Sequence, residues 1–287
     1  MQIGQGGCPE RPGARGMCQE KVQAMRKSGG GLVFAAGLLL TACAAPAPPP
    51  ADPAEQSLLT DFRHVAYGSE RPVLGKNGAA RPRRDHLAKW DIPIRAAFVG
   101  DAEEAYREEA RRHLADLGGL TGLEIAESGA ANANLLIFFA DDPFEAARRH
   151  RALYARRIAD PRNFRDLLAR MEQSATCFGF LWGGWPSGRT IDFSVVFIRT
   201  GLGARTVKGC LVQETTQILG LMNDLAPDAD SVFSDSGRQV DLTPQDRLMI
   251  RLLYDARLKP GMGWAEAEPL ARAALREMKE ETLRGGG

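Results

Sequence analysis

Apolar and polar residues alternate along much of the chain at spacings that predict a succession of strands and helices. Residues 92–99 alternate as a half-buried strand does, and Pro93 favours a sheet edge because proline cannot donate a ladder hydrogen bond. Residues 102–117 have apolar side chains at helical spacing, and Gly118 and Gly119 then predict the end of that helix. The folded part is therefore expected to begin near residue 90.

The run 135–139 is apolar throughout and predicts a central strand that is buried on both faces. Around it the same patterns predict a strand near 123–126, helices over 143–157 and 161–172, and a hairpin of strands over 177–182 and 191–198. The order strand, helix, strand, strand suggests an α/β layer, and the fold class expected for the whole domain is α+β.

The last third of the chain is predicted to be mainly helical. A helix over 205–222 has an apolar stripe, and Glu214 falls inside this stripe instead of on a solvated face. A buried carboxylate must be paired, hydrogen-bonded or open to a cleft. Both an ion pair with an arginine and an open cleft remain consistent with the sequence. A later helix begins at Thr243 with a capping-box pattern, and an amphipathic helix follows the turn at 260–263.

The N-terminal region has the three parts of an export signal: basic residues, a short apolar run, and small residues before a cysteine. The run over 32–40 is too short to span a bilayer. The sequence Leu40-Thr41-Ala42-Cys43 resembles the lipobox of bacterial lipoproteins, which implies that Cys43 receives a lipid and that residues 1–42 are removed. Residues 1–24 do not resemble a leader, and translation from Met25 or Met17 would be more typical.

Composition predicts how the rest of the chain is organised. Residues 43–56, rich in Ala and Pro, form a tether, residues 57–87 form an irregular linker, and residues 88–287 form a single domain. Because Ala44 follows the cysteine, the resemblance implies an outer-membrane address on the periplasmic face, with the inner membrane as the alternative. The membrane is then the first partner, reached through the lipid anchor.

Charge excludes one class of partner. The 37 basic and 36 acidic residues nearly balance, so no overall field draws the protein to nucleic acid. One local excess remains in the predicted helix over 143–157, which is rich in arginine. It could be an anionic-surface patch, although a solvated helix face is the commoner reason for such a run.

A motif in the helix over 205–222 resembles the metzincin zinc motif H-E-x-x-H-x-x-G-x-x-H-D. The matching residues are Gln213, Glu214, Gln217, Gly220, Asn223 and Asp224. Glu214 stands at the general-base position, and carboxamides replace all three histidine ligands. Carboxamide oxygens are poor ligands for Zn²⁺, so we expect no metal and no cofactor. The resemblance implies a zincin-like fold, with a mixed sheet packed against helices and the motif on a central helix.

A second resemblance connects the motif to sequence further along the chain. The stretch 214–224, followed by Leu242-Thr243-Pro244-Gln245-Asp246 and Leu253-Tyr254, is similar to a proteobacterial lipoprotein family built on the domain of unknown function 2927. This resemblance implies a fold and an address, since the family has no assigned reaction.

Two cysteines remain in the expected exported domain, Cys177 and Cys210. An oxidising periplasm favours a disulfide between them, and the alternative is two buried free thiols. The functional hypothesis is a binding or structural module whose partner is a periplasmic protein, a peptide or the cell wall. The rival is a hydrolase that uses Glu214 and Asp224.

Overall fold

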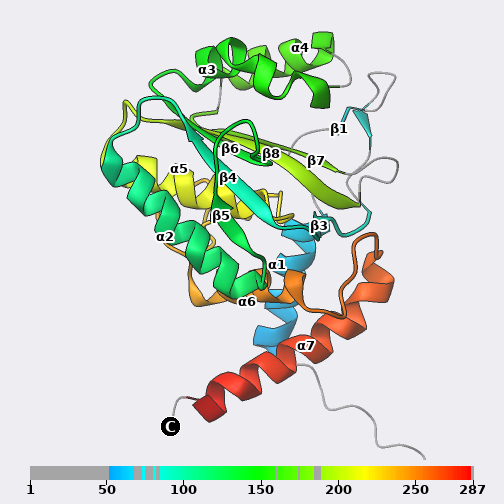
Figure 1. Ribbon diagram of the computed structural model, residues 1–287. Helices are drawn as coiled ribbons and strands as arrows, with labels where there is room; N and C mark the ends of the chain where they lie inside the picture. The colour runs from blue at the N-terminus through cyan, green and yellow to red at the C-terminus, as the bar shows by residue number, and fades with distance from the viewer. Residues whose placement is uncertain are drawn as a thin grey trace, which may run out of the picture. The chain divides into compact units, whose positions relative to one another are not determined.

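The computed structural model describes residues 52–67, 73–74, 80–81, 85–158, 161–173, 175–183 and 189–285 (Figure 1). Its helices are α1 (Pro53–Tyr67), α2 (Glu104–Thr121), α3 (Pro143–Arg149), α4 (Pro161–Met171), α5 (Ala204–Gln217), α6 (Pro244–Tyr254) and α7 (Trp264–Gly285), with 3-10 turns η1 (Arg151–Leu153) and η2 (Ala155–Arg157). Its strands are β1 (Val73–Leu74), β2 (Ala80–Arg81), β3 (Lys89–Trp90), β4 (Ile94–Val99), β5 (Ile125–Glu127), β6 (Leu135–Ala140), β7 (Phe178–Gly183) and β8 (Thr190–Arg199). The predicted leader, Cys43 and most of the tether lie outside the described residues.

A mixed sheet forms the centre of the domain. Its strands run in the order β3-β8-β6-β4-β5 and are parallel, while β7 pairs antiparallel with β8. The prediction that residues 135–139 form a central strand is confirmed, because β6 lies between β4 and β8 and is buried on both faces. The hairpin prediction is confirmed by β7 and β8, although the expected loop at 186–188 lies outside the described residues. The mixed sheet and the helices packed on it fit the predicted α+β class.

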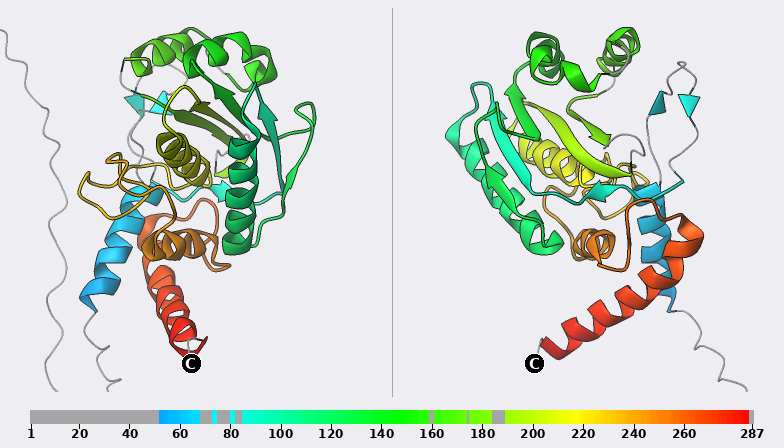
Figure 2. Two further views of the ribbon diagram at one scale, coloured as in Figure 1. Left: turned by 90° about the vertical axis from the view of Figure 1, so that its left-hand side faces the viewer. Right: turned by 45° about the vertical axis from the view of Figure 1, so that its right-hand side comes forward.

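The two faces of the sheet pack against different helices (Figures 1 and 2). Alternate residues of β6 divide between two cores: Leu135 and Ile137 join the larger core with α2 and α5, and Leu136 and Phe138 join an aromatic core under α3 and α4. Phe138 stacks on Phe197 of β8, with ring centroids 4.6 Å apart. The sheet is therefore covered on both faces, which explains the apolar sequence of its central strands.

The first helix corrects the predicted linker. Residues 57–87 were expected to be irregular and 43–56 to be a tether, but α1 forms a helix from Pro53 to Tyr67. Its buried side chains Leu58, Leu59 and Phe62 belong to the larger core. Glu55 is 3% exposed and forms ion pairs with Arg272 and Arg276 of α7, each at 3.0 Å. The folded domain therefore includes α1 and begins well before residue 88.

Three smaller predictions are also corrected. β4 is an inner strand, and Pro93 lies just before it, where the missing N–H removes no ladder bond. α2 continues through Gly118 and Gly119 to Thr121 and is capped by Gly122, whose left-handed backbone lets its N–H bond the carbonyl of Gly118. α5 ends at Gln217, several residues earlier than the predicted helix. In the described part of the chain, no helix combines the length and apolar character needed to cross a membrane.

Candidate functional site

The motif helix α5 forms one wall of a cleft of about 740 Å³. The other walls come from the end of α4, the residues that lead into β7, and the loop between α5 and α6. Five charged side chains from these elements line the cleft: Arg170, Arg205, Glu214, Asp224 and Asp235. Both signs of charge therefore meet in a space large enough for a small or extended ligand.

Glu214 reaches the cleft because a glycine faces it from the sheet. A Cβ atom at Gly179 of β7 would lie 3.4 Å from Oε2 of Glu214 and 3.2 Å from Cγ2 of Ile218. A larger residue would separate strand from helix, whereas glycine lets them pack closely. The structure places Glu214 in the wall of the cleft.

Two of the three positions that resemble zinc ligands engage carboxylates of the cleft. Gln217 donates from Nε2 to Oδ1 of Asp224 at 2.6 Å. Gln213, one turn earlier, donates from Nε2 to Oδ1 of Asp235 at 3.1 Å and more weakly to Oδ1 of Asp224 at 3.4 Å. The carboxamide nitrogens therefore face oxygen acceptors, so these side chains link α5 to the loop that follows.

Asn223, at the third of these positions, points toward α1 instead of into the cleft. Asn223 is 6% exposed, and its Nδ2 lies 2.7 Å from Nε2 of His64 in α1. The same His64 nitrogen lies 2.9 Å from the carbonyl oxygen of Asp224, so it can accept from one or donate to the other according to its tautomer. Asn223 does not line the cleft with Gln213 and Gln217, and the three positions do not converge on one point.

These side chains do not fit a zinc ion. Nowhere in the described residues do three or more His, Cys, Asp or Glu side chains gather where they could hold one metal. The motif supplies two carboxamides that are bonded to Asp224 and Asp235 and a third that is turned to α1. A zinc site needs imidazole, thiolate or carboxylate ligands that converge on one point, and the three carboxamides at the motif's ligand positions are not such ligands.

Gly220 makes the sharp turn after α5. Its φ is +123°, and a Cβ atom there would lie 2.1 Å from the carbonyl oxygen of Ala88. Two side chains then bond the carbonyls at the end of α5: Trp90 donates from Nε1 to Ile218 at 2.9 Å, and Tyr254 donates from its hydroxyl to Leu219 at 3.0 Å. Burial raises the pKa of Tyr254, which keeps its hydroxyl protonated as a donor. The second signature pair, Leu253-Tyr254, is therefore part of the support for the motif turn.

Asp246 fixes the loop that carries Asp224 and Asp235. It is fully buried and accepts hydrogen bonds from Ser231 Oγ at 2.5 Å, Val232 N at 3.1 Å and Thr243 N at 2.8 Å. The bonds with Thr243 complete the predicted capping box at the start of α6, which is confirmed. Sequence patterns identified the cap but not the attachment to Ser231 and Val232, which are distant in the chain.

The predicted disulfide is confirmed. Cys177 and Cys210 are bonded, with Cα atoms 5.9 Å apart, and both border the cleft. The bond joins the residue before β7 to the middle of α5, so the strand and the motif helix are covalently linked.

Two histidines from other helices contact the motif. His113 of α2 is 7% exposed, and its Nε2 lies 3.1 Å from Oγ1 of Thr216 in α5. Burial lowers the pKa of His113 to about 4, so it is neutral at physiological pH. His64 contacts the motif turn through Asn223. Neither histidine lines the cleft.

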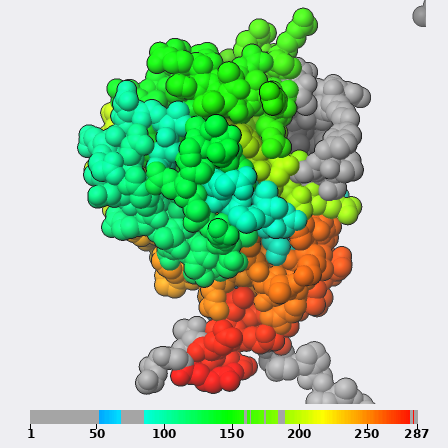
Figure 3. Space-filling model, viewed as in Figure 1, coloured from blue at the N-terminus to red at the C-terminus, as the bar shows by residue number. Residues whose placement is uncertain are grey.

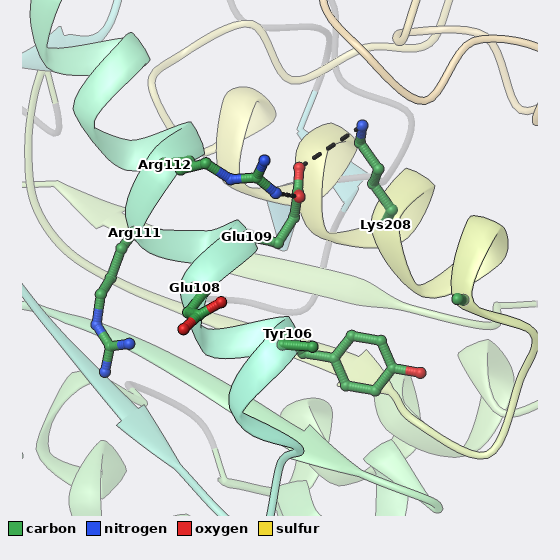
Figure 4. A pocket seen from close by; sticks show the side chains of 8 residues that line it. Tyr106, Glu108, Glu109, Arg111, Arg112 and Lys208 are labelled. Carbon is green, nitrogen blue, oxygen red and sulfur yellow. Dashed lines mark ion pairs between the residues drawn. The ribbon is translucent and has the colours of Figure 1, made fainter.

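A second hollow, of about 700 Å³, lies between α2 and α5 (Figure 4). Part of its charge is neutralised locally, because Glu109 pairs with Arg112 and Lys208, and Lys208 also pairs with Asp241 at 2.5 Å. The cleft beside Glu214 is therefore the better candidate for a binding site.

The family follows from a comparison with family models. The model described as protein of unknown function (DUF2927) matches residues 55–273. The chain belongs to the DUF2927 family. No curated protein and no solved structure matches the chain. The DUF2927 match begins inside α1 and ends inside α7, so it includes the whole cleft and the helix that replaces the predicted linker.

Proposed function

We propose that this DUF2927 protein is a lipid-anchored lipoprotein facing the periplasm, with a zincin-like domain that lacks zinc ligands and binds a partner without catalysis. Support for the zincin-like fold comes from the mixed sheet, the antiparallel strand β7, and the motif helix α5 packed beside that strand. Support for the anchor comes from the lipobox-like sequence that ends at Cys43.

One observation supports the loss of catalysis most directly. Gln213 and Gln217 donate to Asp235 and Asp224, and Asn223 is turned to His64, so no ligand set for zinc is assembled. Without a metal to lower the pKa of a bound water, a carboxylate such as Glu214 is a weak hydrolytic base. The cleft itself remains open, which favours binding.

The cleft and the adjacent strand suit a peptide or a protein segment. Arg170 and Arg205 can pair with carboxylates of a ligand, and Asp235 and Glu214 face the same space. Within the described residues, β7 pairs only with β8, so its other edge can accept an extended chain. We therefore place the partner, a periplasmic protein or peptide, in this cleft.

Metal analysis of the purified protein tests the loss of catalysis. We expect no stoichiometric zinc and no change of melting temperature with a chelator, because packing and not a metal holds α5 in place. Changing Gln213, Gln217 and Asn223 together to His tests whether the backbone could still hold a metal. Finding one zinc per chain in the unchanged protein would contradict the proposal.

Site-specific photo-crosslinking tests binding in the cleft. Thr206 is exposed and lines the cleft, and Ala256 is exposed after α6 and does not line it. A photoreactive residue at Thr206 should give a discrete crosslinked product in cells, while the same residue at Ala256 should not. Equal products at both positions would argue against a cleft ligand.

The anchor is tested at Cys43. The Cys43→Ser variant should lose acylation and move from the detergent phase to the aqueous phase, as judged by mass spectrometry and phase partitioning. Fractionation of membranes then tests the outer-membrane address that Ala44 favours. Acylation that persists in Cys43→Ser would refute the anchor.

The second candidate is a hydrolase, favoured by the fact that Glu214 and Asp224 line the same cleft. It predicts cleavage activity that disappears in Glu214→Gln. The binding proposal predicts that Glu214→Gln changes affinity alone.

A further inference from the structure

The segment from α3 to α4 presents an unusual concentration of arginine. Residues 143–173 contain eight arginines, no lysine and four carboxylates, a formal charge of +4 in a chain whose total is +1. All eight arginines are exposed. We call this surface the arginine face; its members are Arg148, Arg149, Arg151, Arg156, Arg157, Arg162, Arg165 and Arg170.

Part of this charge is already paired inside the domain. Arg148 contacts Glu172 through two nitrogens at 3.2 Å, and Arg157 contacts Asp192 at 2.9 Å. The first pair joins α3 to the residue that follows α4, and the second joins η2 to β8. Among the described residues, however, no carboxylate pairs with Arg151, Arg156 or Arg170. The arginine face therefore keeps guanidinium groups that can receive an external anion.

The chemistry of these groups points to carboxylate or phosphate ligands. A guanidinium presents a planar fork of donors that matches such groups in a bidentate manner, whereas lysine offers a hydrated point charge. The use of arginine alone over residues 143–173 fits this kind of recognition better than it fits solubility. Arg170 also lines the cleft, so the arginine face is continuous with the candidate site.

The position of the arginine face favours a polar polymer over a membrane. α3 and α4 lie across the sheet from α1, where the proposed tether joins the domain, and α3 lies at the outer surface (Figures 1 and 3). Insertion into a bilayer also needs apolar side chains. Leu153, 44% exposed, is the only large apolar residue exposed on the described part of this face, because Phe144, Tyr154 and Leu168 are buried in the aromatic core.

We propose that the arginine face docks on the carboxylates of the cell-wall peptide stems, with the domain held between its membrane and the wall. This inference rests on the proposed export to the periplasm. It assigns a second partner to the arginine face, which shares only Arg170 with the lining of the cleft.

Co-sedimentation of the purified mature protein with isolated sacculi tests this proposal. We expect binding that weakens with salt and is lost on sacculi whose carboxylates have been amidated. Arg151→Glu with Arg156→Glu should weaken binding by about tenfold, because two exposed ion pairs are replaced by repulsion. Lys259→Glu with Arg284→Glu alters the charge equally at exposed positions on the other side of the sheet and should leave binding unchanged.

Three outcomes would overturn the proposal: undiminished binding to amidated sacculi, equal loss in both double variants, or binding to phosphatidylglycerol vesicles as tight as to sacculi. Circular dichroism melts of both double variants confirm that they fold. Failure of export would appear as unacylated Cys43 in cells, whereas failure of this inference would appear as an acylated protein that does not bind sacculi.

Discussion

Reduction of the Cys177–Cys210 bond should destabilise the domain by an amount that its position allows us to estimate. The bond closes a segment with a sequence separation of 33 residues. In the chain-entropy treatment, closing such a loop removes about 12.5 cal/mol/K from the unfolded state, which corresponds to about 3.7 kcal/mol at 25 °C. For a domain of this size, that loss lowers the melting temperature by roughly 10 °C.

Thermal melts with and without a reductant measure this effect directly. The Cys177→Ser, Cys210→Ser double variant serves as the control, because it should melt near the reduced protein and should not respond further to reductant. A melting temperature that is unchanged by reduction would refute the reasoning. So would alkylation of both thiols in folded protein that had not been reduced.

Three further predictions concern the supports of the motif. Gly220→Ala should destabilise the fold by about 3 kcal/mol or more in urea titrations, because a Cβ there meets the Ala88 carbonyl at 2.1 Å and φ is +123°. The control is Gly119→Ala, which should be neutral or stabilising because no atom lies within 4 Å of the added carbon. Asp246→Ala should cost about 3 kcal/mol or more, since it leaves the buried Val232 and Thr243 amides without their acceptor; a loss below about 1 kcal/mol would contradict this role. Burial lowers the pKa of His113 to about 4, so the stability that the neutral imidazole contributes is complete above pH 6.5 and is lost as pH falls toward 4. Between pH 7 and 4.5 the free energy of unfolding should fall by about 2 to 3 kcal/mol more in the unchanged protein than in His113→Gln. Parallel pH profiles of the unfolding free energy in the two proteins would refute the assignment.

Elements with a strong local pattern were predicted well, and the failures have local causes. β6 and the β7–β8 hairpin follow from apolar runs that any buried strand requires. The sequence does not predict α1 because the helix follows a Pro-rich stretch and has nearly as many polar as apolar residues, although Leu58, Phe62 and Val65 have helical spacing. The end of α2 was placed too early because a glycine pair is only a weak stop signal when packing continues the helix.

The candidate site could be predicted only where it is local in sequence. The spacing of Gln213 and Gln217 places both on one face of α5, and the structure puts both in the cleft. Arg170 and Asp235 come from other elements, and no pattern within the motif could have identified them. The orientation of Asn223 depends on His64, which belongs to the helix that sequence reasoning missed.

The contact between α1 and the motif turn has a mechanical consequence. Any force transmitted along the chain from its N-terminal side enters the described domain at α1. Glu55 resists it through Arg272 and Arg276 at one end of the helix, and His64 meets Asn223 and the Asp224 carbonyl near the other. Asp224 lines the cleft and also accepts a hydrogen bond from Gln217. A displacement of α1 along its axis would therefore reach the cleft through two hydrogen bonds, the one between His64 and Asp224 and the one between Gln217 and Asp224. A load on the N-terminal end of α1 and the occupancy of the cleft are thus mechanically coupled in this domain.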